Sequence, residues 1–235
     1  MLLDAHIHIK DSSSFFPADA IFFVNSTIPD EWEMVVRYSQ TNKNVIPFLG
    51  IHPWNLEKAQ TGWEVLLKEL LVKNPDTGIG EIGLDKLKKT PVDLQIAFFK
   101  KQFEIALSLN RPVSIHCVKS FEILFEIFEE YKLKTLNGIL HRFEGSKKEM
   151  YTLLKYGLYI SFFYSLHFRE KVKEAFIECP IDRVFLESDA GNGPELLKLK
   201  EHYVRASILK NIEFETFQKK IVENGQIFKN SSFNR

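Results

Sequence analysis

Residues 2–9 read LLDAHIHI, a short apolar run that ends in two histidines. A run of this length and composition is typical of a buried β-strand. Because successive side chains of a strand point to opposite faces, His6 and His8 lie on the same side. Two imidazoles placed in this way can bind one metal ion together. The stretch therefore predicts a strand with a metal site near its end.

Seven further runs of this kind follow along the chain. They cover residues 20–27, 45–52, 77–84, 112–117, 137–143, 158–163 and 184–189. Between them, apolar residues recur at three- and four-residue spacing, which is typical of helices. Strand–helix alternation repeated eight times predicts a parallel sheet of the α/β class, and eight units favour a closed (β/α)8 TIM barrel. An open doubly wound sheet is the alternative, but it would scatter the polar strand ends.

The segment between the first two predicted strands is unusually short. It reads KDSSSFFPAD (10–19), whereas a parallel crossover needs about a dozen residues or more. We therefore expect the barrel to lack or shorten its first helix. The chain has 235 residues and no linker-like stretch, and α/β barrels commonly run to this length without splitting. We expect a single domain over residues 1–235.

Composition narrows the class of protein. The formal net charge is zero, so no overall field attracts nucleic acid or a membrane surface. The two cysteines are too few for a disulfide framework, which fits a reducing compartment. The first residues lack the basic region of a signal peptide, and no apolar run approaches the length of a membrane span. These features predict a cytoplasmic enzyme without a membrane partner, and they indicate no protein partner.

Four more potential metal ligands lie near the ends of predicted strands. They are Glu81, His116, His141 and Asp189. In a TIM barrel the carboxyl ends of all strands surround one mouth, where active sites lie. We therefore expect these four side chains to meet the two histidines of the first strand. Four imidazoles and two carboxylates are the ligands that a paired divalent-metal hydrolytic site needs.

The two carboxylates suit different roles in such a site. Glu81 offers two oxygens and could bridge two ions about 3.5–4 Å apart. The histidines of the first strand would hold one ion, and His116 and His141 would hold the other. Asp189 could contact the first ion and accept a proton from its water, whose pKa falls from about 15.7 toward about 7. The mixed ligands leave Mg, Mn and Zn open.

Several motifs of the chain carry a family resemblance. They are DAHIH (4–8), GIHPW (50–54), GEIGLD (80–85), PVSIHC (112–117), HRFEGS (141–146), ESDA (187–190) and the terminal VENGQIFK (222–229). In this order they resemble the TatD family of metal-dependent hydrolases, often described as deoxyribonucleases, from residue 4 to about residue 228. The resemblance implies two divalent metal ions held by all six residues above, with Glu81 as the bridge and Asp189 as the activator. It also implies phosphodiester cleavage, with DNA as the usual substrate.

One departure from the family leaves a second hypothesis open. After ESDA the chain continues as AGNGPELLK (190–198), whereas family members usually carry a longer loop with arginine or asparagine residues that reach phosphates. The leading hypothesis is a phosphodiesterase that acts on DNA ends or single strands. The alternative is an amidohydrolase-like enzyme that cleaves a C–N or ester bond of a small molecule with the same metals. A decayed, non-enzymatic barrel is disfavoured because all six ligand types remain.

Substrate contacts are expected at the same mouth. The residues predicted to bind substrate are His52, Lys119 and Arg142, with Lys10 and Lys86 as further candidates for phosphate contacts. The aromatic residues predicted to stack on unpaired bases are Trp54, Phe143, Phe163 and Tyr164. Of the remaining histidines, His167 is expected at the start of a helix after the seventh strand, where it could belong to a mobile loop, and His202 at the surface of a helix.

Overall fold

Eight parallel strands, consecutive in the chain, form one sheet in the computed structural model, which describes residues 1–11 and 14–233. Their bounds are Leu2–Ile7 (β1), Ala20–Asn25 (β2), Val45–Leu49 (β3), Gly78–Asp85 (β4), Val113–Val118 (β5), Gly138–Leu140 (β6), Tyr159–Phe162 (β7) and Val184–Leu186 (β8). Each strand pairs in parallel with the next. This order excludes an open doubly wound sheet, in which the strand order reverses. The predicted barrel is confirmed.

The sheet closes between its first and last strands. Ile7 forms a parallel bridge with Ala190 just beyond β8. Ser188 donates from its backbone N–H and from its hydroxyl to the two carboxylate oxygens of Asp4, at 2.9 and 2.6 Å. Asp4 is fully buried, and a buried carboxylate must be hydrogen-bonded to be tolerated. The aspartate of the opening motif is therefore explained by barrel closure.

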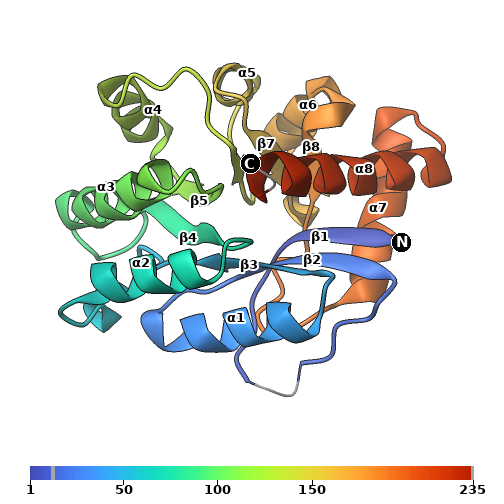
Figure 1. Cartoon of the computed structure of the whole chain (residues 1–235). Helices are drawn as coiled ribbons and strands as arrows, with labels where there is room; N and C mark the ends of the chain where they lie inside the picture. The colour runs from blue at the N-terminus through green and yellow to red at the C-terminus, as the bar shows by residue number, and fades with distance from the viewer. Residues whose placement is uncertain (12–13, 234–235) are drawn as a thin grey trace.

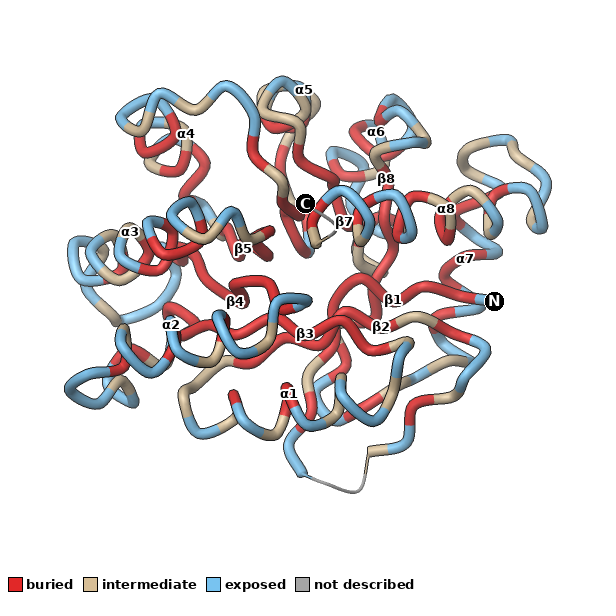
Figure 2. Tube along the Cα trace, viewed as in Figure 1, coloured by how far each residue is buried: buried red, intermediate tan, exposed pale blue. Residues whose placement is uncertain are grey.

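Helices surround the strands on the outside of the barrel (Figure 1). Their bounds are Trp32–Thr41 (α1), Trp63–Lys73 (α2), Val92–Ser108 (α3), Phe121–Glu130 (α4), Lys147–Lys155 (α5), Glu170–Glu178 (α6), Leu196–Lys210 (α7) and Phe214–Phe233 (α8). Buried residues follow the strands and the inner faces of the helices, and exposed residues lie on the outer faces (Figure 2). Between β1 and β2 the described residues form no helix, as expected; residues 12 and 13 of that connection lie outside the described part.

The terminal motif VENGQIFK packs against the amino ends of the strands. Asn224 in α8 donates from its side-chain amide to the carbonyls of Ile181 and Val184, at 2.8 and 3.0 Å. A Cβ at Gly225 would lie only 2.0 Å from Leu3 Cδ1, so a glycine is required for this close approach. Helix α8 thus seals the end of the barrel opposite the mouth.

No helix formed by the described residues is long and apolar enough to cross a membrane.

His202 is buried, and the expectation that it lies at the surface was wrong. Helix α7 turns it toward the end of β7, where its Nε2 lies 2.9 Å from the carbonyl oxygen of Phe162. A carbonyl only accepts, so the proton of neutral His202 is on Nε2. Its Nδ1 then accepts from His167 Nε2 at 2.8 Å. The helical pattern predicted an exposed position because histidine is a polar residue, and the pattern does not show whether its nitrogens have hydrogen-bond partners in the core.

We expect His202→Ala to lower the free energy of unfolding by about 2–3 kcal/mol, because it leaves a buried carbonyl and His167 without their partners. Burial also lowers the pKa of His202 to about 3 and that of His167 to about 4, from the ordinary 6.5. Below pH 6.5 the unfolded chain therefore binds more protons at these sites, and stability present above this pH is lost as the pH falls.

Urea unfolding at pH 7 and pH 5 measures both effects. The variant should be less stable than wild type at pH 7 and should lose less stability between the two pH values. Lys200→Ala, on the exposed face of the same helix, is the control and should stay within about 0.5 kcal/mol of wild type. A His202→Ala variant as stable as this control would contradict the structural role.

Candidate metal centre

The six predicted ligands come together at the mouth of the barrel. His6 lies in β1 and His116 in β5, while His8 and His141 directly follow β1 and β6. Glu81 was expected near the end of its strand but is the fourth residue of β4, because the pairing of β4 with β5 continues to Asp85. The register of this pair is irregular around Glu81, and the carboxylate still points to the mouth.

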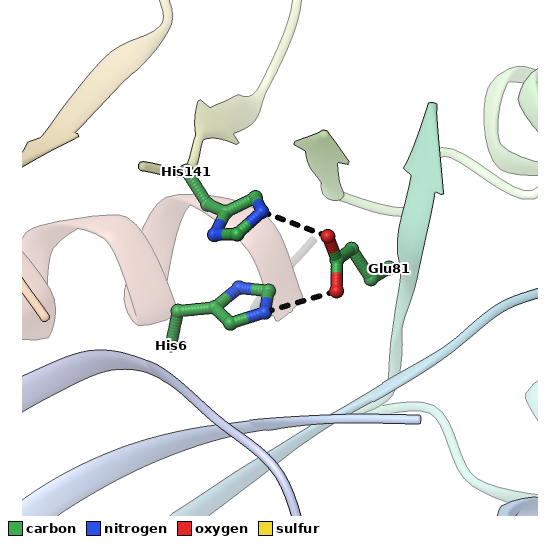
Figure 3. Close-up of side chains that lie close together, drawn as sticks. All are labelled: His6, Glu81 and His141. Atoms are coloured by element: carbon green, nitrogen blue, oxygen red, sulfur yellow. Dashed lines mark hydrogen bonds and ion pairs between the residues drawn. The ribbon is translucent and has the colours of Figure 1, made fainter. Parts of the chain in front are cut away.

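The two carboxylate oxygens of Glu81 face separate pairs of histidines. Oε2 lies 3.2 Å from His6 Nε2 and 3.4 Å from His8 Nε2. Oε1 lies 2.7 Å from His141 Nε2 and 2.8 Å from His116 Nδ1. Figure 3 shows His6 and His141 reaching opposite oxygens of the same carboxylate. This division is the arrangement that a carboxylate between two ions requires.

Asp189 completes the half of the cluster that contains His8. Its Oδ1 lies 3.7 Å from His8 Nε2, and its Oδ2 accepts from the guanidinium of Arg142. Burial raises the pKa of Asp189, but the neighbouring histidines, His8 first among them, outweigh it, so the pKa is lowered. Asp189 is therefore a carboxylate at neutral pH and can accept a proton.

The outer nitrogens of the β1 histidines have partners of their own. His8 Nδ1 lies 2.8 Å from the backbone oxygen of Asn25, which only accepts, so Nδ1 carries the proton. His8 Nε2 then presents its lone pair to the cluster. His6 Nδ1 lies 3.4 Å from the hydroxyl of Ser114, and its Nε2 also points inward. Both rings are held in the orientation that a metal ligand needs.

Carboxylates orient the other two histidines. His141 Nδ1 lies 3.3 Å from Glu187 Oε1, and His116 Nε2 lies 3.5 Å from Asp85 Oδ2. Because a carboxylate accepts, Glu187 and Asp85 favour a proton on the outer nitrogen of each ring, so the inner nitrogen is the one that metal binding would deprotonate. A carboxylate behind a histidine is the usual outer partner of a metal-bound imidazole.

His52 lies in the same cluster but is oriented differently. The backbone N–H of Trp54 donates to His52 Nδ1 at 3.1 Å, so the proton of neutral His52 is on Nε2. This nitrogen lies 3.1 Å from Glu81 Oε1 and donates to it. Burial lowers the pKa of His52 to about 4, which keeps the ring neutral. The structure thus places His52 on the central carboxylate, and its predicted contact with substrate stays a prediction.

The donor atoms fit divalent cations. His116 Nδ1 and His141 Nε2 lie 3.1 Å apart, and the Nε2 atoms of His6 and His8 lie 3.2 Å apart. Lone pairs that face each other at this distance repel unless a proton or a cation lies between them. Burial lowers the pKa of His141, but the nearby carboxylates of Glu81 and Glu187 outweigh it and raise the pKa well above its ordinary value. Metal binding would displace these protons.

A cavity of about 630 Å³ opens above the cluster. Lys10, Trp54 and Arg142 line it, and Lys119 lines the adjoining cavity. The Arg142 guanidinium lies 4.4 Å from the centre of the Phe163 ring. These positions suit contacts with a substrate at the mouth.

Two of the predicted stacking residues lie elsewhere. Phe143 is fully buried and packs against Phe121 and Phe162, so the expectation that it stacks on bases was wrong. Phe143 follows the end of β6, as residues at the mouth do, but its side chain packs into the core. Tyr164 lines a separate cavity beside His202.

The model of the family described as TatD related DNase matches residues 3–228. The chain belongs to this family. One relative of this TatD-family protein is the uncharacterized metal-dependent hydrolase YabD of Bacillus subtilis, 31% identical over 173 residues that cover 71% of this chain and 65% of that protein. Another is the 3'-5' ssDNA/RNA exonuclease TatD of Escherichia coli, 34% identical over 113 residues, which cover 47% of this chain and 43% of that protein. Each match spans less than two thirds of the relative.

Solved structures share the complete barrel of the TatD-family protein. The TatD homologue YJJV of Escherichia coli superimposes with a TM-score of 0.85 at 20% identity and covers 100% of this chain and 98% of its own. A TatD family hydrolase of Entamoeba histolytica gives a TM-score of 0.83 at 18% identity, with the same coverage. At these identities the likeness shows a common fold.

The outer carboxylates of this TatD-family site, Asp85 and Glu187, were not among the residues predicted from the sequence. Asp85 lies four residues after Glu81 in the same strand, a spacing that puts both on one face. Glu187 precedes Asp189 by two residues. Asp85 belongs to the motif GEIGLD and Glu187 to the motif ESDA, both of which were noted in the sequence. The alternation of side chains along a strand could have identified Asp85.

We expect Glu187→Gln to weaken divalent-metal binding about 10- to 100-fold, because His141 loses the carboxylate that fixes its tautomer and orientation. Glutamine keeps the shape of the side chain, so the fold should be retained. Calorimetric titration of the metal-free protein with Zn²⁺ measures the change. Glu174→Gln, half-exposed on α6, removes the same charge away from the site and should bind like wild type. Equal affinities for the two variants would contradict this role of Glu187.

Proposed function

We propose that this protein is a metal-dependent phosphodiesterase that cleaves DNA ends or single strands with two divalent ions. The proposal is supported by the division of the Glu81 carboxylate, whose Oε2 faces His6 and His8 and whose Oε1 faces His116 and His141 and also accepts from His52. His6, His8 and Asp189 would hold one ion, and His116 and His141 the other, with Glu81 between them. When bound, such ions lower the pKa of a water molecule and stabilise negative charge that develops at phosphorus.

The residues of the chain supply proton transfer and positioning. Asp189 is ionised and lies at the mouth, where it accepts the proton of the attacking water. Arg142 pairs with Asp189 and lines the cavity, so its guanidinium can contact a phosphate oxygen of the substrate. His52 donates to Glu81 and fixes the central carboxylate.

The substrate class is supported by the relatives and by the shape of the mouth. The Escherichia coli relative is a 3'-5' ssDNA/RNA exonuclease, and a Schizosaccharomyces pombe relative is the deoxyribonuclease Tat-D. A cavity at a barrel mouth admits a frayed or single-stranded end more readily than a continuous duplex. Trp54, 46% exposed at its rim, offers a face on which an unpaired base can stack. The single domain over residues 1–235 and the cytoplasmic location stay predictions.

Cleavage of end-labelled single-stranded DNA tests the proposal. Metal-free protein is reconstituted separately with Mg²⁺, Mn²⁺ and Zn²⁺, and a blunt duplex and a chelator serve as controls. We expect at least one ion to support cleavage, the single strand to be cut faster than the duplex, and the chelator to stop the reaction. Metal-loaded protein that leaves DNA intact and hydrolyses an amide or lactone would overturn the proposal in favour of the amidohydrolase-like alternative.

A further inference from the structure

A second cavity of about 500 Å³ adjoins the one above the metal cluster. It lies where β5 and β6 end and where α4 and α6 begin. Leu87, Val118 and Arg142 line both cavities, so the two share a wall. Arg142 pairs with Asp189 of the cluster and also lines the second cavity. A ligand that leaves the cluster past Arg142 therefore enters this second space.

The second cavity is cationic although the chain as a whole is neutral. Its basic lining residues are Lys86, Lys119, Arg142, Arg169 and Lys171. Its acidic lining residues are Glu122, Glu144 and Glu149, which leaves an excess of two positive charges. Arg169 pairs with Glu144 at 2.9 Å, and Lys171 lies 3.6 Å from Glu149. Within residues 1–11 and 14–233, Lys86 and Lys119 form no ion pair, so both are available to an anion.

The backbone at two of these positions is unusual. Lys119 has φ of 53° and Arg142 has φ of 44°, in the left-handed region that residues other than glycine rarely adopt. Each follows a ligand-bearing strand, at adjacent places around the barrel. Residues held in this region by the surrounding structure are concentrated at active sites and ligand-binding positions.

We propose that this cationic cavity is a second phosphate subsite, which binds the backbone of a single strand beyond the phosphodiester that lies at the metal cluster. The inference rests on the proposed function. The strand would run from the cluster past Arg142 toward Lys119 and Lys171. The shared wall favours a polyanion over a free anion, because only a chain of phosphates occupies both cavities at once. Oligonucleotides long enough to reach the second cavity therefore bind more tightly than a dinucleotide.

Equilibrium binding without cleavage tests this subsite. A fluorescent hexathymidylate and a fluorescent dithymidylate are titrated with protein in chelator, for wild type, for the double variant Lys119→Gln/Lys171→Gln and for a control. The control, Lys155→Gln/Lys219→Gln, removes the same charge from exposed positions on α5 and α8. Melting temperatures of both double variants verify the fold, and Lys171→Gln alone, on the exposed face of α6, gives a second reading of the subsite.

We expect the cavity variant to reduce the ratio of hexanucleotide to dinucleotide affinity by about tenfold or more. The slope of log affinity against log salt for the hexanucleotide should fall by about 0.7 per lost phosphate contact. The control should keep the wild-type ratio and slope. An unchanged ratio, whether both affinities stay constant or fall by the same factor, would overturn the subsite. If DNA is not cleaved but the ratio still depends on these lysines, the proposed reaction fails and the subsite stands.

Discussion

Glu81→Gln is expected to lower the rate of single-stranded DNA cleavage by about 10³-fold or more, which corresponds to about 4 kcal/mol in the activation free energy. The amide keeps the shape of the side chain but has only one oxygen. It cannot present a negatively charged oxygen both to the side of His6 and His8 and to the side of His116 and His141, as the carboxylate does. Its NH2 group would instead repel the cation on the side that it faces.

Two measurements follow the Glu81→Gln change. Elemental analysis should show fewer than two ions per chain, and the rate at saturating metal should stay low. Circular dichroism verifies that the fold is retained. Glu57→Gln, at an exposed position after β3, is the matched control and should keep both ions and the wild-type rate. A Glu81→Gln variant with half the wild-type rate and two ions would show that the carboxylate is not the bridge.

Asp189→Asn is expected to lower kcat by about 10²- to 10⁴-fold, because the amide cannot accept a proton from the attacking water. Asparagine suits this position, since Asp189 has φ of 49° and asparagine tolerates the left-handed region. The backbone N–H at this position donates to His6 O at 3.0 Å and is unaffected by the change. The loss should therefore be chemical and not structural.

The comparison between kcat and metal content distinguishes the two carboxylates. Asp189→Asn should keep the ion at His116 and His141, which it does not contact, and should bind the oligonucleotide with little change. Glu81→Gln should lose metal as well as rate. If Asp189→Asn retains a rate near that of wild type, the proton acceptor lies elsewhere.

The barrel and the six clustered residues could be predicted because topology determines both. Parallel strands joined by helices must place their carboxyl ends on one side. Histidines and carboxylates at the ends of distant strands, such as His6 and His141, then have to meet. The length of the segment between β1 and β2 was also enough to predict that its described residues form no helix.

Other features depend on distances that no local pattern contains. Asp85 and Glu187 orient histidines of neighbouring strands, and His52 turns its protonated nitrogen to Glu81 because of one backbone N–H. His202 is buried by the packing of α7, and Phe143 turns into the core although it follows a strand end. Each outcome is decided by contacts between elements, and the sequence pattern of the residue itself is ambiguous.

Anomalous diffraction from crystals of the Mn²⁺-loaded protein would locate the ions bound at the barrel mouth. We expect two peaks, about 3.5–4 Å apart, one on each side of the Glu81 carboxylate. His6 and His8 should contact the first and His116 and His141 the second. A cluster without an ion, or a single ion that does not touch Glu81, would contradict this expectation.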